Sequence, residues 1–374
     1  MLLHLQPHHI NRQLRQQSTR AMTMIELLVV ITIIMVLTGV MIPTIRYQNR
    51  NRALREAERQ LNAFIGSAQA RAQQLGRPVG IWIERVNDGD PIVSANHSVS
   101  VYLAEVPLPY SGNLRNSFVK ISGTGVLTFH LPIITGVTPT PGPPTPGLPI
   151  YASDPILHNP NNHLIKDGDR FRIQFNNRGP YYDAVRNATN YRLVLNQRHG
   201  RIPTANLGSS TGIPYQIHRL PKKSFSPPLN LPAGAVIDLS VSGTMAGQNE
   251  FLTNISNRRR PVILMFNPSG GVATVWSNGI PYPPLGWIHL LVGRQNQVFP
   301  TNLWLDEETE KGNVMDMNNR WVSIDHRTGS IVSENVDSID RFIKSSSNQN
   351  ALTVSDKIAA ARQLVRSGTG SEGN

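Results

Sequence analysis

The sequence contains no cysteine, and this absence removes several kinds of chemistry at once. Disulfide bonds, thiolate metal sites and cysteine nucleophiles are all excluded. The absence fits a reducing compartment, and it fits equally well an exported protein that folds without disulfide bonds. The cysteine count therefore limits the chemistry of this protein without deciding its compartment.

Recognisable catalytic and metal-binding motifs are missing as well. None of the 11 histidines forms a His-Glu-x-x-His pair, and His158 and His163 lie in a Pro- and Asn-rich stretch typical of a solvated loop. Ser117–Lys120 matches Ser-x-x-Lys but lacks the partner motifs of such a nucleophile. The acidic run 306–308 and Asp316 offer oxygen ligands that suit calcium, without the spacing of a calcium loop. We therefore expect no catalytic residues, no metal and no cofactor, and an enzyme is the weakest interpretation.

A concentrated basic tract is also absent. The chain has 36 Lys and Arg residues against 24 Asp and Glu, a formal charge of +12. A basic balance can indicate nucleic acid or an anionic membrane as the partner. Here the basic residues are spread thinly and no basic tract contains interleaved aromatic residues, so we expect no nucleic-acid partner.

Charge is almost absent from one long segment near the N-terminus. Residues 1–21 hold three arginines and no acid, and Met22–Ile45 then carries a single charged residue, Glu26. A helix needs about 20 apolar residues to cross a bilayer, so this segment predicts a transmembrane helix, with a buried core helix as the alternative. A secretory signal has a shorter apolar centre of about 7 to 15 residues followed by a small-residue cleavage site. Here the small residue, Ala21, precedes the apolar run.

The residues from Ala21 to Ile31, AMTMIELLVVI, resemble the prepilin cleavage and methylation motif of type IV pilins and type II secretion pseudopilins. The resemblance implies that a prepilin peptidase cuts between Ala21 and Met22 and that the new N-terminus at Met22 is methylated. Glu26 is then the fifth residue of the mature chain, as in the family. This sequence departs from the family pattern in having Ala21 where glycine is usual and Met22 where phenylalanine is usual.

The family also implies a reason for the carboxylate in the apolar segment. A charge inside a membrane is costly and normally has a partner. In the family, the glutamate is thought to pair with the N-terminal amine of a neighbouring subunit during assembly, and Glu26 would take this role. The alternative is a glutamate that reaches to the lipid headgroups. Gly39 and Pro43 weaken the helical hydrogen-bond ladder, so we expect a helix break there.

An amphipathic pattern follows the apolar segment over residues 46–76. Apolar residues recur at three- and four-residue steps, and Gly76 is a suitable end. The pattern predicts either one helix from about Thr23 to about Leu75 or two helices separated at Pro43. The apolar positions are Leu54, Ala57, Leu61, Phe64, Ile65, Ala68, Ala72 and Leu75.

Only β signals follow, over residues 77–336. A Pro-rich insertion is expected at about 130–232, with few clear strands after residue 150, and residues 337–374 form a C-terminal extension that is partly helical and then disordered. Strands are predicted at 81–83, 99–103, 171–175, 191–195, 236–241, 262–266, 272–276, 287–292 and 321–324.

These segments predict an α+β fold. A long N-terminal α-helix, membrane anchor plus amphipathic half, would pack on an antiparallel β-sheet domain with loop insertions. Within the pilin and pseudopilin families, the chain is most similar to H-type minor pseudopilins, in the stretches SAQARAQQLGRPVGIWIE, AVIDLSVSG, VILMFNPSGGVATVW and WVSIDHRTGSIV.

The resemblance implies a minor pseudopilin-like structural subunit that assembles into a periplasmic pseudopilus of a type II secretion system through its N-terminal helix. The expected partners are the prepilin peptidase, other pseudopilin or pilin subunits, and inner-membrane lipid. The chain would be a single-pass protein of the bacterial inner membrane, with a cytoplasmic N-terminus and a periplasmic C-terminal domain. The flanking basic residues do not favour this orientation by themselves. A minor type IV pilin of a pilus or DNA-uptake machine, and a pilin-stemmed surface binding or adhesion module, are alternatives.

Overall fold

The computed structural model describes most of the chain beyond residue 22, with gaps. Of residues 39–50 only the helical backbone is described. The described residues are 23–87, 89–131, 152–153, 157, 164–165, 170–187, 193–195, 212–253, 260–305, 310–339, 352–363 and 365.

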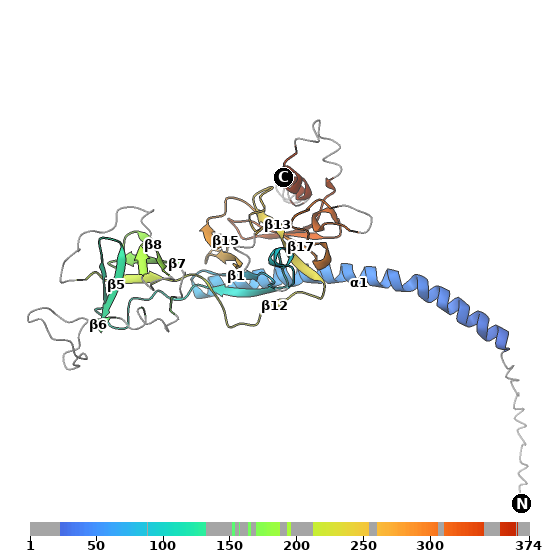
Figure 1. Ribbon diagram of the computed structural model, residues 1–374, viewed down its shortest axis with the longest axis horizontal. Helices are drawn as coiled ribbons and strands as arrows, with labels where there is room; N and C mark the ends of the chain where they lie inside the picture. Colours follow the sequence, from blue (N-terminus) through green and yellow to red (C-terminus); the bar gives the residue numbers. More distant parts are fainter. Residues whose placement is uncertain are drawn as a thin grey trace, which may run out of the picture. The chain divides into compact units, whose positions relative to one another are not determined.

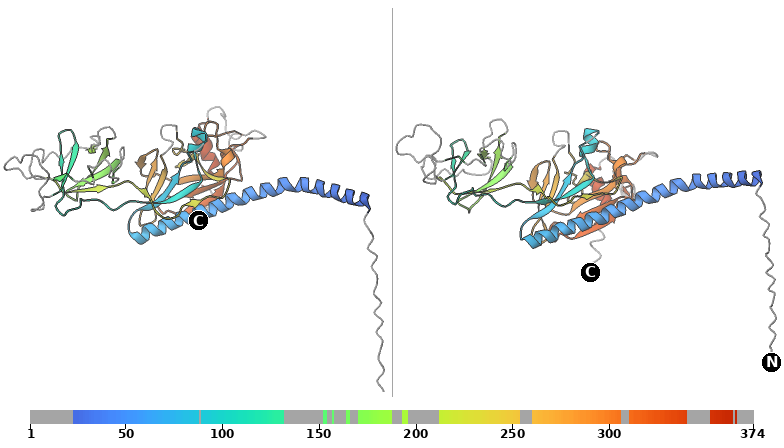
Figure 2. Two further views of the ribbon diagram at one scale, coloured as in Figure 1. Left: turned by 60° about the horizontal axis from the view of Figure 1, so that its bottom comes forward. Right: turned by 90° about the horizontal axis from the view of Figure 1, so that it is seen from below.

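The chain begins its regular structure with helix α1, Met24–Leu75, which is 52 residues long. By contacts within the chain, residues up to Arg52 form one compact unit and residues from Ala53 onward form another. The second part of α1 therefore belongs to the same unit as the β-strands. Both views in Figure 2 show this end of the helix alongside the strands on which it packs.

The amphipathic pattern of this second part is confirmed where the helix meets the main core. Six of its eight predicted apolar positions are at most 1% exposed and share one hydrophobic cluster with residues of two sheets. Phe64 is partly buried against the same cluster, whereas Leu75, the last residue of the helix, is 43% exposed. The six buried positions are Leu54, Ala57, Leu61, Ile65, Ala68 and Ala72.

The first sheet, sheet A, is antiparallel and has the strand order β11–β3–β1–β14–β15–β16, with β12 also paired to β3. Figure 1 labels β1, β12 and β15 of this sheet. Its strands are β1 (Val79–Glu84), β3 (Ser100–Glu105), β11 (Lys222–Lys223), β12 (Leu229–Asn230), β14 (Val262–Phe266), β15 (Val272–Ser277) and β16 (Ile280–Tyr282).

Strands β3 and β11 are neighbours although residues 106–221 separate them in the sequence. Lys222 of β11 pairs with Glu105 of β3, so the intervening segment is an insertion into sheet A. The two ends of the insertion meet at Tyr110 and Ile217, whose backbones exchange hydrogen bonds of 2.9 and 2.8 Å. The expected insertion at about 130–232 is thus placed too late, because β11 and β12 belong to sheet A.

The second sheet, sheet B, has the order β19–β18–β17–β13–β2. The long strand β13 is buried along its whole length, with a register irregularity between Asp238 and Gly243 where it pairs with β17. A short C-terminal helix, α5 (Val354–Ala361), contributes Ala361 to the core beside this sheet. The strands are β2 (His97–Ser98), β13 (Ala235–Thr244), β17 (Ile288–Arg294), β18 (Arg320–Ile324) and β19 (Ile331–Asn335).

The third sheet, sheet C, lies in the insertion and has its own hydrophobic core. It has the order β10–β7–β8–β9–β5–β4, with β6 paired to β5. We expected few clear strands after residue 150, and this expectation is wrong. The strands are β4 (Phe118–Ile121), β5 (Val126–Leu131), β6 (Ala152–Ser153), β7 (Arg170–Phe175), β8 (Tyr181–Arg186), β9 (Leu193–Leu195) and β10 (Tyr215–His218).

The expected α+β class, with the long helix packed on a single sheet domain, is therefore corrected. The described chain is mostly β, with three antiparallel sheets, and apart from α1 its described helices are short. The predicted strands are confirmed at β1, β3, β7, β9, β13, β14, β15, β17 and β18, although residues 191 and 192 lie outside the described residues. The error arose because sheet C depends on pairing between distant segments, and no local pattern reports such pairing.

Candidate functional site

The start of α1 carries a capping box that the sequence analysis did not identify. The backbone N–H of Glu26 donates to Thr23 Oγ1 at 3.3 Å. In return, Thr23 donates to Glu26 Oε2 from its backbone N–H at 3.1 Å and from its hydroxyl at 3.2 Å. A Thr-x-x-Glu pattern directly before an apolar run is the sequence signature of this arrangement. Glu26 therefore has a local role as well as the expected role in assembly.

The carboxylate keeps one oxygen uncommitted within this cap. Both hydrogen bonds from Thr23 go to Oε2, and the described part of the chain places no hydrogen bond on Oε1. The Glu26 side chain is exposed, and it lies in the first turn, where the helix dipole favours a negative charge. One oxygen can thus hold the helix terminus while the other accepts a further donor.

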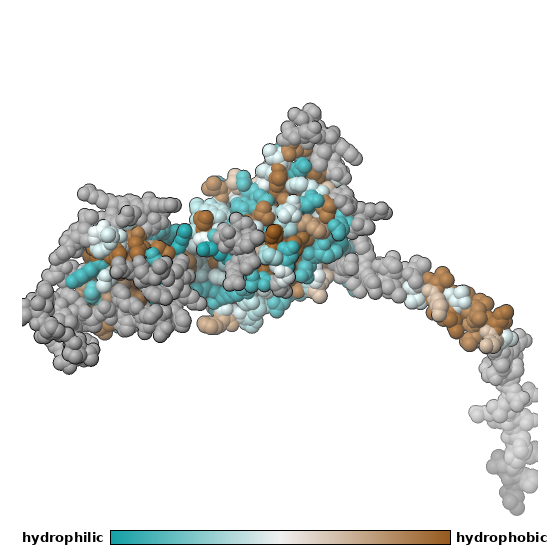
Figure 3. All heavy atoms as spheres, viewed as in Figure 1, coloured by the Kyte–Doolittle hydropathy of each residue, from teal (hydrophilic) through white to brown (hydrophobic). Residues whose placement is uncertain are grey.

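The first described turns of α1 expose apolar side chains on all sides of the helix. Figure 3 shows these residues in brown. The two hydroxyls in this stretch are satisfied within the helix, because Thr32 donates to the Leu28 carbonyl at 2.8 Å and Thr38 to the Ile34 carbonyl at 2.7 Å. A helix that is apolar on all sides needs an apolar environment. The exposed residues are Met24, Ile25, Leu27, Leu28, Val29, Val30, Ile31, Ile33, Ile34, Met35, Val36 and Leu37.

The structure tests the expected membrane span only over part of its length. Within the described residues, no helix combines the length and the apolarity that a bilayer crossing requires. The single-pass anchor was expected over residues 22–45. Met22 and the side chains of residues 39–45 lie outside the described residues.

The remaining predicted site residues have different outcomes. Ala21 and Met22, the expected cleavage and methylation positions, lie outside the described residues. Helix α1 runs through Gly39 and Pro43 without interruption, so its backbone has no break at either residue. A proline removes one hydrogen bond and clashes with one carbonyl, and the intact turns on both sides keep the chain helical.

Three polar contacts fix the second part of α1 to the strands and turns of its own unit. Glu58 accepts from Arg320 of β18 at 2.8 Å, and both side chains are largely buried. Asn62 donates to the Ser333 hydroxyl at 2.8 Å, and Gln69 donates to the Gly329 carbonyl at 2.6 Å. These contacts set the rotation of the helix about its axis, which apolar packing alone specifies poorly.

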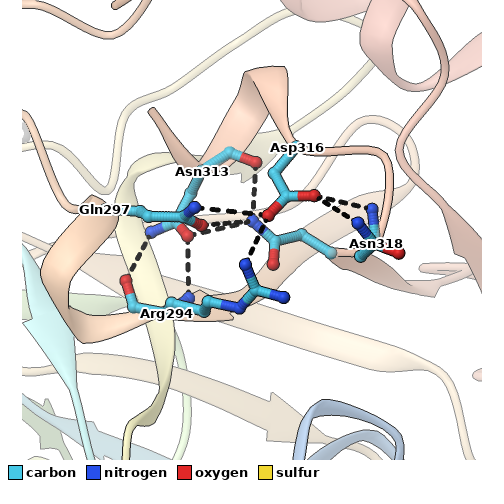
Figure 4. Close-up of polar contacts among 6 residues, drawn as sticks. Arg294, Gln297, Asn313, Asp316 and Asn318 are labelled. Carbon is cyan, nitrogen blue, oxygen red and sulfur yellow. Dashed lines mark hydrogen bonds and ion pairs between the residues drawn. The ribbon is translucent and has the colours of Figure 1, made fainter. Parts of the chain in front are cut away.

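Asp316, which we considered as a calcium ligand, is instead bound by donors of the chain (Figure 4). It accepts from Arg294 Nη1 at 2.8 Å, from Gln297 Nε2 at 3.2 Å, and from the Asn318 backbone and amide at 3.0 and 2.8 Å. Burial opposes ionisation, but the Asn318 hydrogen bonds and the Arg294 charge hold the pKa of Asp316 below its ordinary value. Residues 306–308 lie outside the described residues.

A second buried carboxylate, Asp238 in β13, lies beside this network. It is 2% exposed and accepts from the Ser240 backbone at 2.9 Å and from the Asn313 amide at 2.9 Å. Burial raises the pKa of Asp238, against the opposing effects of the Ser240 and Asn313 hydrogen bonds and the nearby His97. Gly293 makes room for Asn313, since a Cβ there would lie 2.3 Å from the Asn313 side-chain oxygen. This polar cluster joins sheet B to the loop at 313–319.

We expect Asp316→Asn to lower the free energy of unfolding by about 2 kcal/mol, because it removes the charged carboxylate that pairs with the largely buried Arg294 at 2.8 Å. The folded-state pKa of Asp316 is below the unfolded value of about 3.9, so the contribution of the pair is complete above that pH and declines as the pH falls through the folded-state pKa. Urea unfolding at pH 7 and pH 3 measures both effects. Glu56→Gln, in the exposed Arg59–Glu56 pair, is the control, and an equal loss in both variants would contradict the prediction.

The described residues contain no metal-binding group, these polar clusters included. They contain no group of three or more His, Asp or Glu side chains able to hold a metal ion. His158 and His163 lie outside the described residues. Ser117 is 5% exposed and bonds within its own turn, to the Leu114 backbone. No protein-family model, no curated protein and no solved structure matches this chain.

Proposed function

We propose that this chain is a minor pseudopilin-like structural subunit of a type II secretion system. A prepilin peptidase removes residues 1–21, and the mature protein assembles with other pseudopilin subunits through the start of α1. The protein resides in the bacterial inner membrane, with its N-terminus cytoplasmic and its β-sheet unit periplasmic. It works by assembly and carries out no catalysis.

The observation that carries this proposal is the arrangement at the start of α1. The helix begins at Met24, two residues after the proposed mature N-terminus, and Glu26 lies in its first turn with one carboxylate oxygen uncommitted. The apolar side chains that follow are exposed in the single chain, as expected for a surface that neighbouring subunits or lipid cover. The sequence motif from Ala21 to Ile31 points to the same processing.

Mass spectrometry of the N-terminus tests the processing step. We expect the mature protein to begin at N-methylated Met22 when the chain is produced with a prepilin peptidase, and to keep residues 1–21 when the peptidase is absent. Ala21→Gly restores the usual family residue and should be cut at least as fast. An intact leader in the presence of the peptidase, or a cut after Ile45, would contradict the proposal.

A second candidate function rests on the insertion at 106–221. Sheet C has its own core, and the ends of the insertion meet at the backbone pair Tyr110 and Ile217. This arrangement suits a binding module carried by a pilin-like stem, such as a minor type IV pilin or a surface adhesion protein. The two candidate functions make different predictions: an adhesion module requires the insertion to bind a ligand, and a secretion subunit does not.

A further inference from the structure

The face of sheet A opposite the helix carries a row of side chains in direct register. Trp82 of β1 lies between Tyr102 of β3 and Ile263 of β14, and Ile263 lies beside Trp276 of β15. We call these four residues the aromatic row. Their neighbours in sequence, Ile81, Ile83, Val101, Leu103, Leu264 and Val275, belong to the core that also includes α1. Because side chains alternate along a strand, the aromatic row must face the other way.

Three of the four residues of the aromatic row, Trp82, Ile263 and Trp276, line hollows in the surface. A groove of about 370 Å³ is lined by Trp82, Phe171, Leu220 and Pro221, among others. An adjoining hollow of about 140 Å³ extends along the row to Ile263 and Trp276. A space of this size is in the range that accommodates small ligands and short oligomers.

The charged groups around the groove are mainly cationic. Arg170 and Arg219 line the larger hollow, and Arg170 and Arg260 line the smaller one. Among the described residues, none of these three guanidinium groups has a carboxylate partner; Arg219 donates to the Leu108 carbonyl at 3.2 Å. Lys223 lies 4.2 Å from the Tyr102 ring centre, but its ammonium group already pairs with Glu84 at 2.5 Å. The three arginines and Lys222, which also lines the larger hollow, therefore place positive charge beside the groove.

Two donors in the lining have no acceptor. The indole Nε1 of Trp82 and the Nε of Arg219 are buried without a hydrogen-bond partner among the described residues. The charged and aromatic polar groups that line the groove are donors: guanidinium, ammonium and indole N–H groups. Such a lining favours a ligand that is rich in acceptors and negatively charged.

We infer that the groove along the aromatic row binds an acidic saccharide, with pyranose rings against Trp82 and Trp276 and carboxylates at the arginines. Guanidinium groups pair with carboxylates through two parallel hydrogen bonds, which fixes orientation as well as charge. Trp82 on β1 and Trp276 on β15 are separated by one strand, β14. At the usual spacing between neighbouring strands they lie about 10 Å apart, a distance comparable to the length of two linked sugar rings. A saccharide thus matches both the flat apolar row and the cations beside it.

The geometry favours a saccharide over two other anionic polymers. A single-stranded nucleic acid needs a basic groove that follows its backbone beside several stacking platforms. Here the three arginines lie around two adjoining hollows instead of forming a stripe along a backbone path. An acidic peptide would use the arginines but gains little from two tryptophans set two strands apart. The inference does not rest on assembly as a pseudopilin; because Arg170 and Arg219 lie in the insertion at 106–221, saccharide binding would favour the second candidate function.

Titration calorimetry with the full chain in detergent micelles tests the inference, with tetragalacturonate as the probe and its methyl ester as the neutral control ligand. We expect saturable binding of the acid and at least tenfold weaker binding of the ester. Arg260→Glu should weaken binding of the acid at least tenfold. Arg327→Glu, at an exposed position in the turn between β18 and β19, should change it less than twofold.

Trp82→Ala should weaken the binding of both ligands at least tenfold, and its melting temperature shows whether the variant folds. Arg260→Glu serves as a second variant that should fold normally, because the Arg260 side chain is exposed and replacing it creates no cavity. Absence of saturable binding, or equal losses in the Arg260 and Arg327 variants, would overturn the inference. Tighter binding of an oligothymidylate or of a polyglutamate peptide, lost in Trp82→Ala, would also overturn it and would assign the groove to that polymer.

Discussion

Glu26→Gln should leave removal of residues 1–21 unchanged and reduce incorporation of the protein into filaments by at least tenfold. The amide oxygen of glutamine can still accept the hydrogen bonds from Thr23, so the cap at the start of α1 survives. The negative charge is lost, and with it the attraction to the N-terminal amine of a neighbouring Met22. An amine buried among apolar helices without a counter-charge is unfavourable by several kcal/mol. Co-purification with the other filament subunits, after cross-linking, measures incorporation.

Thr23→Val is the matched control, because it removes the cap and keeps the charge. It loses the hydroxyl that bonds to Glu26 and should cost about 1 kcal/mol of helix stability, with filament incorporation reduced less than threefold. Glu26→Ala removes both roles and should assemble no better than Glu26→Gln. If Thr23→Val fails to assemble while Glu26→Gln assembles normally, Glu26 acts through the cap, and the proposed subunit contact is wrong.

The observed cap at Glu26 and its proposed assembly contact show what a local sequence pattern can and cannot predict. The motif from Ala21 to Ile31 identifies the residue, and Thr23-x-x-Glu26 contains the signature of the capping box. The helix phase of Leu54, Leu61 and Ile65 likewise follows from spacing alone, and the structure buries all three. Each of these features depends on residues three or four positions apart, which the sequence displays directly.

Features that depend on contacts between distant residues cannot be predicted from local spacing. Lys222 pairs with Glu105 across the whole insertion, and nothing in the short β11 segment indicates this pairing. The alternating pattern around Asp238 predicts a strand but not the buried contact of its carboxylate, because its partner Asn313 is 75 residues away. In sheet C, β7 and β9 follow from their alternating sequence, but the pairing of β5 with β9 and of β7 with β10 joins distant segments and could not be predicted in this way.

The C-terminal extension is the other place where distant contacts decide the structure. We expected residues 337–374 to be partly helical and then disordered, and α5 is a helix with a capping box at Thr353 and Asp356. The last residues lie outside the described residues. Arg362, which the sequence analysis did not single out, is fully buried directly after this helix. Burial lowers the pKa of Arg362 to about 9, so it remains charged at neutral pH.

Arg362 binds β13 and the turn after it through four backbone carbonyls. Its Nη1 donates to Met245 at 3.1 Å and Ala246 at 3.2 Å, and its Nη2 donates to Val241 at 2.8 Å and Gln248 at 3.1 Å. Met245 has a φ of 59°, a left-handed conformation that is unfavourable for a residue with a side chain. The guanidinium therefore holds a strained turn in place and satisfies the buried carbonyl of Val241.

Arg362→Ala should lower the free energy of unfolding by about 4 kcal/mol, the largest loss that we expect from a single substitution in this chain. The substitution removes four hydrogen bonds from a charged donor, and each carbonyl left buried without a partner costs about 1 kcal/mol or more. It also removes the guanidinium 4.8 Å from the Trp321 ring centre and opens a cavity beside that ring. Thermal and urea unfolding followed by tryptophan fluorescence measure the loss.

Arg362→Lys separates the charge from the hydrogen-bond geometry. Lysine keeps the positive charge but presents three donors from a single atom, so it cannot reach carbonyls on both sides of the turn as the planar guanidinium does. We expect it to recover at most half of the loss seen with alanine. Arg327→Ala, an exposed arginine, should change stability by less than about 0.5 kcal/mol. If Arg362→Ala proves as mild as this control, α5 is peripheral to the folded unit; the expected loss instead makes the C-terminal segment part of the core of sheet B.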